Sequence, residues 1–187
     1  MADGRAVCFI GPMGAGKTSI GRRVAKRLGV PFADTDAAIV RAHGPIAEIF
    51  RTRGESAFRE IEREAVREAV EAGGVVSLGG GAVLAPETQR LLAEHLVVLL
   101  TVSERTVASR IRGGRRPLLA GEDPMAEWRR IGEERRPVYE RLADRTFDTS
   151  HGPLRRVVDD AAAWAAERLG IELSPAGEHG EGEENAR

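Results

Sequence analysis

The chain has 187 residues, 42% hydrophobic and 30% charged, with a formal net charge of −1. That length favours one ordinary globular domain, and the balanced charge argues against a large basic surface for nucleic acid. No apolar stretch is long enough to span a bilayer and no secretory-signal layout opens the chain, so we expect a cytoplasmic protein without membrane partners. Cys8 is expected to be a small buried hydrophobe, and the scattered histidines show no metal-ligand spacing.

Five short apolar segments predict strands, at residues 6–10, 31–34, 75–78, 96–102 and 146–149. Helix-like stretches follow them, at residues 19–28, 55–71, 86–94, 104–112, 124–143 and 154–169. Strands that alternate with helices predict a five-stranded parallel sheet covered on both faces, which is a three-layer α/β/α arrangement. Such sheets bind ligands at the carboxyl ends of their strands.

The first predicted strand and helix are joined by Gly-Pro-Met-Gly-Ala-Gly-Lys-Thr at 11–18, which fits the pattern G-x-x-x-x-G-K-[ST]. Glycines let backbone N–H groups converge on phosphate oxygens, and the helix that follows points its positive dipole end at the same anion. Lys17 would lie near the β and γ phosphates, and the Thr18 hydroxyl would reach Mg²⁺. A chance glycine turn would not explain the flanking strand and helix. The pattern therefore predicts a P-loop NTPase fold.

We assign nucleotide binding to the residues of this loop and the start of its helix, namely Gly14, Ala15, Gly16, Lys17, Thr18 and Ser19. Any metal should arrive with the nucleotide. The bound species is expected to be a nucleotide with Mg²⁺.

Two carboxylates, Asp34 and Asp36, follow the second predicted strand in Phe-Ala-Asp-Thr-Asp at 32–36. One could hold the hydration shell of Mg²⁺ while the other reaches the hydroxyl of an acceptor. The structural alternative is N-capping of a helix that begins near residue 37, because Asp is favoured at that position.

Three consecutive glycines end the third predicted strand, in Val-Val-Ser-Leu-Gly-Gly-Gly at 75–81. A tight turn would need one glycine, whereas three suggest a backbone that lies flat against a ligand. The alternative is a flexible linker, although linkers seldom follow a core strand directly. Because the carboxyl ends of parallel strands share one edge, the P-loop, the aspartates and these glycines should meet there.

Three arginines are candidates for contacts with anions. Arg59 and Arg135 could grip a carboxylate by bidentate hydrogen bonds. Arg116 lies in Gly-Gly-Arg-Arg-Pro-Leu-Leu at 113–119, whose glycine hinges predict a mobile lid that brings a cation to a transferring phosphoryl group. Taken singly, each arginine is more often a surface residue paired with a nearby glutamate.

The residues after 173 differ in composition from the rest, with proline, glycines and an acidic cluster in place of apolar periodicity. We therefore expect a catalytic domain at 1–173 and a disordered acidic tail at 174–187.

Together these motifs make the sequence similar to the shikimate kinases over residues 5–170. The stretches that carry the resemblance are those at 11–18 and 32–36, Gly-Glu at 54–55 with Phe-Arg-x-x-Glu at 58–62, the triple glycine, Arg-Pro-Leu-Leu at 116–119, and Glu-Arg-x-Pro-x-Tyr at 134–139. The resemblance implies transfer of the γ-phosphoryl group of ATP to the 3-hydroxyl of shikimate, a step toward chorismate and the aromatic amino acids.

The resemblance also implies roles for individual residues. Shikimate would be bound by Asp36, Arg59, Gly80, Gly81 and Arg135, the arginines through its carboxylate. The catalytic residues would be Lys17, Asp36 and Arg116. Thr18 would ligate Mg²⁺ and Asp34 would hold it through water.

Four further positions gain a role from the same resemblance. Arg110 would lie near the adenine, and Arg116 would contact phosphate. Phe50 and Phe58 would line the acceptor pocket, and Glu62 would orient an arginine. The sequence departs from the family pattern in a short stretch between Arg110 and Arg116 and in the acidic tail, which has no family counterpart.

Two other functions fit these motifs less well. A gluconate or nucleoside monophosphate kinase would share the P-loop and lid but needs a different acceptor pocket. A regulatory nucleotide switch is disfavoured because the sequence contains no Asn-Lys-x-Asp motif for guanine. We expect a monomer, because no hydrophobic surface stripe argues for association.

Overall fold

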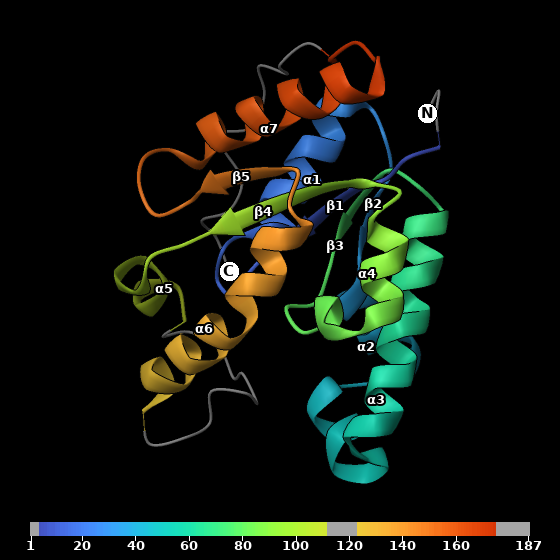
Figure 1. Cartoon of the computed structure of the whole chain (residues 1–187), viewed down its shortest axis with the longest axis vertical. Coiled ribbons are helices and arrows are strands. Elements are labelled where there is room, and N and C mark those ends of the chain that lie inside the picture. The colour runs from blue at the N-terminus through green and yellow to red at the C-terminus, as the bar shows by residue number, and fades with distance from the viewer. Residues whose placement is uncertain (1–3, 112–122, 175–187) are drawn as a thin grey trace, which may run out of the picture.

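The computed structural model describes residues 4–111 and 123–174. Its strands are β1 (Val7–Ile10), β2 (Phe32–Asp34), β3 (Val75–Ser77), β4 (Leu96–Thr101) and β5 (Arg145–Asp148). Its helices are α1 (Lys17–Leu28), α2 (Thr35–His43), α3 (Ile46–Glu71), α4 (Pro86–Leu92), α5 (Glu104–Ile111), α6 (Pro124–Leu142) and α7 (Leu154–Leu169), with a short 3₁₀ helix, η1 (Ala82–Leu84), before α4. All strand pairs are parallel, in the order β2-β3-β1-β4-β5 (Figure 1). The predicted five-stranded parallel sheet is confirmed.

Both faces of the sheet are buried under helices. Because successive residues of a strand point to opposite faces, one strand contributes to two cores. In β4, Leu96 and Val98 pack into a core with α1 and α7. Their neighbours Val97 and Leu99 pack into a second core with residues of α3, α4 and α6. Figure 1 shows α7 on one side of the strands and α3, α4 and α6 on the other. The three-layer α/β/α prediction is therefore confirmed.

A smaller apolar cluster joins α2 to the first part of α3. Its buried residues are Ile39, Ile49 and Phe58. The sequence predicted a helix from residue 55, but α3 begins at Ile46 and contains a break at Gly54, where φ is 80° and ψ is 171°. This non-helical backbone divides α3 into two helical pieces with different directions. Glycine adopts the left-handed φ without strain, which explains the residue found there.

The register of the strands brings three functional loops to one edge. Ser77, at the end of β3, is aligned with Phe9 of β1 on one side and with Asp34 of β2 on the other. The chain segments that follow β1, β2 and β3 at this edge each continue into one of the predicted site motifs. The structure thus confirms that these loops meet at the carboxyl ends of the strands.

Within residues 4–111 and 123–174, no helix is both long and apolar enough to cross a membrane. Ser174, the last described residue, donates its backbone N–H to the carbonyl of Arg27 at the end of α1. Residues 175–187 lie outside the described part, so the acidic tail and the domain boundary at 173 stay predictions.

Candidate active site

A cavity of about 780 Å³ opens at the carboxyl edge of the sheet. Its walls come from the P-loop, α2, α3, the glycine run after β3, and α6. The lining residues that the sequence singled out are Gly14, Gly16, Lys17, Thr18, Ser19, Asp36, Phe50, Phe58, Arg59, Glu62, Gly80, Gly81 and Arg135. Residues from distant parts of the chain therefore share one cavity, as predicted.

The P-loop has the backbone that its glycines predicted. Gly14 and Gly16 have φ values of 83° and 90°, in the left-handed region that favours glycine. A Cβ at Gly14 would also collide with the side chain of Val107 in α5. Lys17 Nζ donates to the carbonyl oxygens of Gly11 at 2.9 Å and Pro12 at 3.1 Å, so the ammonium group folds over the loop.

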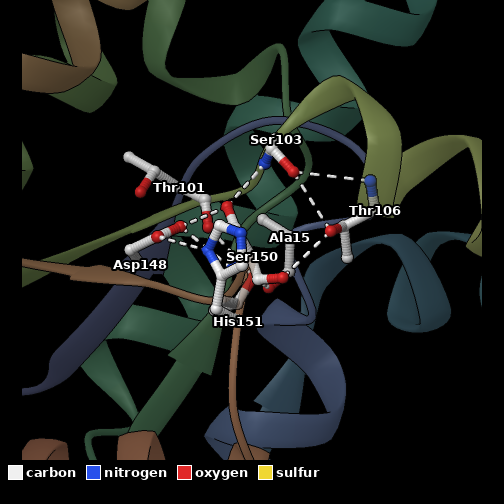
Figure 2. A network of polar contacts seen from close by, with 8 residues as sticks. Ala15, Thr101, Ser103, Thr106, Asp148, Ser150 and His151 are labelled. Atoms are coloured by element: carbon white, nitrogen blue, oxygen red, sulfur yellow. Dashed lines mark hydrogen bonds and ion pairs between the residues drawn. The ribbon is translucent and has the colours of Figure 1, made fainter.

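A polar network fixes the P-loop to the ends of β4 and β5 (Figure 2). Thr149 Oγ1 lies 3.0 Å from the carbonyl oxygen of Ala15 and 2.9 Å from that of Thr101. Ser150 Oγ accepts from the N–H of Ser103 at 2.7 Å. Ala15 is fully buried and does not line the cavity, and its carbonyl is the loop atom that Thr149 contacts. Neither Thr149 nor Ser150 was expected from the sequence to contribute to the site.

Asp34 links β2 to both neighbouring helices. Its Oδ2 accepts from Thr18 Oγ1 at 2.6 Å, and its Oδ1 accepts from the N–H of Ala37 at 3.0 Å. The N-cap of α2 is thus Asp34, and Asp36 lies within the first turn. The capping alternative is correct for Asp34 and wrong for Asp36. A hydroxyl beside a carboxylate is the oxygen donor set that Mg²⁺ prefers.

The carboxylate of Asp36 faces the cavity and has a raised pKa. Its surface is open to the cavity, yet protein surrounds it on most sides. This desolvation, with the negative charges of Asp34 and Glu62, raises the pKa of Asp36 to about 6, although the positive charge of Lys17 acts in the opposite direction. A carboxylate with this pKa is largely ionised at neutral pH and still able to take up a proton.

The three glycines after β3 leave room for functional side chains. A Cβ at Gly79 would lie 2.5 Å from Asp36 Oδ1, and one at Gly81 would lie 2.8 Å from Arg59 Nη1. A Cβ at Gly80 would lie 3.6 Å from Arg135 Nη1. None of these glycines has a positive φ. Gly79 and Gly81 thus permit close approach by side chains of α2 and α3, where approach by a ligand was expected, whereas the distance at Gly80 is an ordinary contact.

The two arginines assigned to a carboxylate lie beside the same glycine run. Arg59 Nη1 donates to Glu62 Oε2 at 2.7 Å, and Glu62 is only 5% exposed. Burial alone would lower the pKa of Arg59, but the hydrogen bond and charge of Glu62 outweigh it and raise the pKa further. The contact agrees with the expectation that Glu62 orients an arginine. Arg135 approaches the run from α6, whose Tyr139 hydroxyl donates to the carbonyl of Gly80.

One face of α6 supplies a wall that the sequence analysis largely missed. Besides Arg135, its residues in the cavity are Trp128, Ile131, Gly132 and Tyr139. They are spaced three, four, seven and eleven residues from Trp128, which is the spacing of one helical face. Residues at this helical spacing on either side of Arg135 were the sequence signal that could have predicted the wall.

Two predicted residues lie wholly or partly outside the described residues. Arg116 belongs to the range 112–122, and so does most of the predicted lid. Arg110 lies in α5, but its side chain is outside the described part. The roles assigned to both stay predictions.

Comparison with known proteins places this site in a family. A family model described as Shikimate kinase matches residues 13–166. The chain belongs to the shikimate kinase family. A shikimate kinase of Mycobacterium avium (strain 104) is 52% identical to it over 145 residues, which cover 76% of this chain and 82% of that protein.

Solved structures agree with this membership. The shikimate kinase from Acinetobacter baumannii, in complex with shikimate, has a TM-score of 0.82 at 32% identity and covers 88% of this chain and 94% of its own. A gluconokinase from Sinorhizobium meliloti has a TM-score of 0.56 at 20% identity and covers 91% and 98%. At 20% identity the gluconokinase shows a similar fold alone. The A. baumannii shikimate kinase is similar to this chain in both fold and sequence.

Proposed function

We propose that the chain is an ATP-dependent shikimate kinase, which transfers the γ-phosphoryl group of ATP to the 3-hydroxyl of shikimate and releases ADP and 3-phosphoshikimate. The observation that carries this proposal is one cavity that joins the P-loop to Asp36, Arg59 and Arg135. The shikimate found in the A. baumannii relative supports the choice of acceptor. The product places the enzyme in chorismate and aromatic amino acid biosynthesis.

The P-loop wall would bind the phosphates of ATP. Backbone N–H groups of the loop and the N-terminus of α1 would face phosphate oxygens, and Lys17 would turn from the loop carbonyls toward the β and γ phosphates. Thr18 would hold Mg²⁺ directly and Asp34 would hold it through water, because their oxygens adjoin at the start of α1. When bound, Mg²⁺ neutralises part of the charge on the transferring group.

The opposite wall would bind shikimate. Arg59 and Arg135 would hold its carboxylate, since guanidinium groups match carboxylates in geometry and charge. Phe50 and Phe58, whose ring centres lie 4.5 Å apart, would cover the apolar side of its ring. Gly80 and Gly81 would allow the substrate to approach the backbone.

Asp36 would orient the 3-hydroxyl toward the phosphoryl group and accept its proton during an in-line transfer. Arg116 would approach the phosphoryl group from the lid, and Arg110 would lie near the adenine. These lid assignments rest on the family resemblance. A monomeric state, a cytoplasmic location and the absence of nucleic-acid partners stay predictions from composition.

The proposal is tested by ADP release from the purified protein with ATP and Mg²⁺, using shikimate, gluconate, a panel of nucleoside monophosphates or no acceptor. We expect release with shikimate alone, and its loss in Lys17→Met with the fold retained. Release with another acceptor would overturn the assignment of the second substrate. Near-normal turnover in Lys17→Met would overturn the assignment of the P-loop.

A further inference from the structure

Helix α6 is attached to both halves of the candidate active site. Near its N-terminus, Trp128 Nε1 donates to the carbonyl of Met13 in the P-loop at 2.9 Å. Near its C-terminus, the Tyr139 hydroxyl donates to the carbonyl of Gly80. The helix therefore spans the cavity from the nucleotide side to the acceptor side.

The carbonyl of Met13 continues a row of hydrogen-bonded loop carbonyls. Those of Gly11 and Pro12 accept from Lys17, which belongs to the loop itself. The carbonyl of Met13 instead accepts from Trp128, 115 residues further along the chain. The partly buried indole N–H thus fixes the loop to an element that lies outside it.

The same helix carries Arg135 on the face that contains Trp128. The two residues are seven positions apart, which is two turns and about 10 Å along the axis. Both line the cavity. The two turns from Trp128 to Arg135 precede Pro137, the proline inside α6, so the position of Trp128 constrains the position of Arg135 relative to the loop.

A second contact holds the start of α6, but it is more exposed. Arg129 pairs with Glu104 of α5 at 2.7 Å, and the two side chains are 52% and 45% exposed. Water screens such a pair, so it contributes little to holding the helix. The indole of Trp128 is the less exposed of the two attachments.

We propose that Trp128 is a positioning residue, which ties the phosphate-binding loop to α6 and thereby sets Arg135 relative to the bound nucleotide. The part that concerns Arg135 rests on the proposed function, whereas the tie to the loop does not. The competing explanation is that Trp128 only packs against its neighbours. Trp128→Phe separates the two, because it keeps an aromatic ring and removes the N–H.

The tie to the loop is tested by fluorescence. The chain has two tryptophans, so Trp164→Phe leaves Trp128 as the only one. Trp164 lies in α7 and packs against the core that the sheet forms with α1 and α7. Titration of the Trp164→Phe protein with Mg·ADP should give a saturable change in emission, and the Trp128→Phe protein should give none. No change in the Trp164→Phe protein would overturn the tie, whatever the acceptor.

The effect on Arg135 is tested by steady-state kinetics on wild type, Trp128→Phe and Trp164→Phe. We expect Trp128→Phe to lower kcat/KM for ATP about 3- to 10-fold and to raise KM for shikimate, with Tm falling less than about 5 °C. Trp164→Phe should match wild type in both constants. Unchanged KM values in Trp128→Phe, with or without a loss of Tm, would overturn the proposal.

The failure of the proposed function would look different. If the Trp164→Phe protein shows the expected emission change with Mg·ADP but neither it nor wild type phosphorylates shikimate, the acceptor assignment and the role of Arg135 are overturned. That outcome would leave the tie between Trp128 and the loop supported.

Discussion

Thr18 Oγ1 donates a hydrogen bond of 2.6 Å to Asp34 Oδ2, which joins the start of α1 to the end of β2. The other oxygen of the same carboxylate caps α2. A single side chain thus serves the proposed metal site and the local fold, and substitutions can separate the two roles.

Asp34→Asn should lower activity while retaining the helix cap. Asparagine caps helices about as well as aspartate, so the free energy of unfolding should change little, whereas Asp34→Ala should lose about 1 kcal/mol. Both variants should need more Mg²⁺ for half-maximal turnover. Urea unfolding and Mg²⁺ titrations of the rate check this. An asparagine variant with a normal Mg²⁺ requirement would contradict the proposed role in metal binding.

The raised pKa of Asp36 predicts the pH dependence of activity. Because the pKa is about 6, the carboxylate becomes protonated as the pH falls through that value. We therefore expect kcat/KM for shikimate to fall below about pH 6, with the profile of a single group that takes up one proton. A profile that stays flat to pH 5 would contradict Asp36 as the group that accepts the proton.

The same pKa predicts the pH dependence of stability. A carboxyl group whose pKa is higher in the folded protein than its ordinary value of 3.8 stabilises the fold below that value. This contribution is lost as the pH rises through about 6, where the folded protein must ionise the group. Asp36→Asn should therefore raise Tm more at pH 8 than at pH 5. An equal gain at both pH values would contradict this account.

Thr35 should be needed for the geometry of the site although it lies outside the cavity lining. Its fully buried Oγ1 accepts from the N–H of Gly79 at 3.0 Å and lies 3.4 Å from the carbonyl of Ser77. Thr35→Val has a similar shape but leaves that N–H unpaired, so we expect a loss of about 1–3 kcal/mol and a lower kcat. Thr35→Ser keeps the hydroxyl and should retain most of both. Equal behaviour of the two variants would show that packing, and not the hydrogen bond, matters.

Alanine substitution should reduce turnover at Gly79 and increase stability at Gly132. A Cβ at Gly79 would meet Asp36 Oδ1 at 2.5 Å, so Gly79→Ala should displace this carboxylate and strongly reduce turnover. Gly132 lies inside α6, and among residues 4–111 and 123–174 no atom outside its own helix backbone lies within 4 Å of a Cβ placed there, so Gly132→Ala should stabilise the protein by up to about 1 kcal/mol. Thermal unfolding and shikimate-dependent ADP release compare the two. A fully active Gly79→Ala would contradict the close packing.

The two arginines should differ in their effect on stability. Replacement of Arg59 or Arg135 by Ala should raise KM for shikimate about 10- to 100-fold, because each variant loses charged hydrogen bonds to the carboxylate of shikimate. Arg59→Ala should also lower Tm, since it leaves the buried Glu62 without its 2.7 Å partner. Arg135→Ala should lower Tm less. An unchanged KM for shikimate in both variants would show that neither binds the acceptor.

Local patterns predicted the five strands, most of the helices and the edge at which the site forms. The P-loop spacing, the strand before it and the helix after it are encoded within about twenty residues, and alternation of strands with helices fixed the layers. Asp36, Arg59, Gly80, Gly81 and Arg135 were expected in the site because each lies in a short motif, and all five line the cavity. Their convergence then followed from the topology of a parallel sheet.

The contacts that the sequence did not predict join distant segments. The bond from Trp128 to Met13 and that from Thr149 to Ala15 depend on how α6 and β5 dock, which no local pattern specifies. The glycine run lines the cavity, and the atoms that approach it include side chains of α2, α3 and α6, which the sequence did not predict. The start of α3 was missed because the break at Gly54 interrupts its periodicity.

The identity of the reaction product tests the central claim most directly. After incubation of the purified protein with ATP, Mg²⁺ and shikimate, phosphorus and proton NMR of the product would locate the new phosphate ester. Our account predicts one product, esterified at the 3-hydroxyl and formed in equal amount to ADP, with none from Lys17→Met. An ester at another hydroxyl, or ADP formed without an ester, would contradict the arrangement of Asp36 and the arginines proposed here.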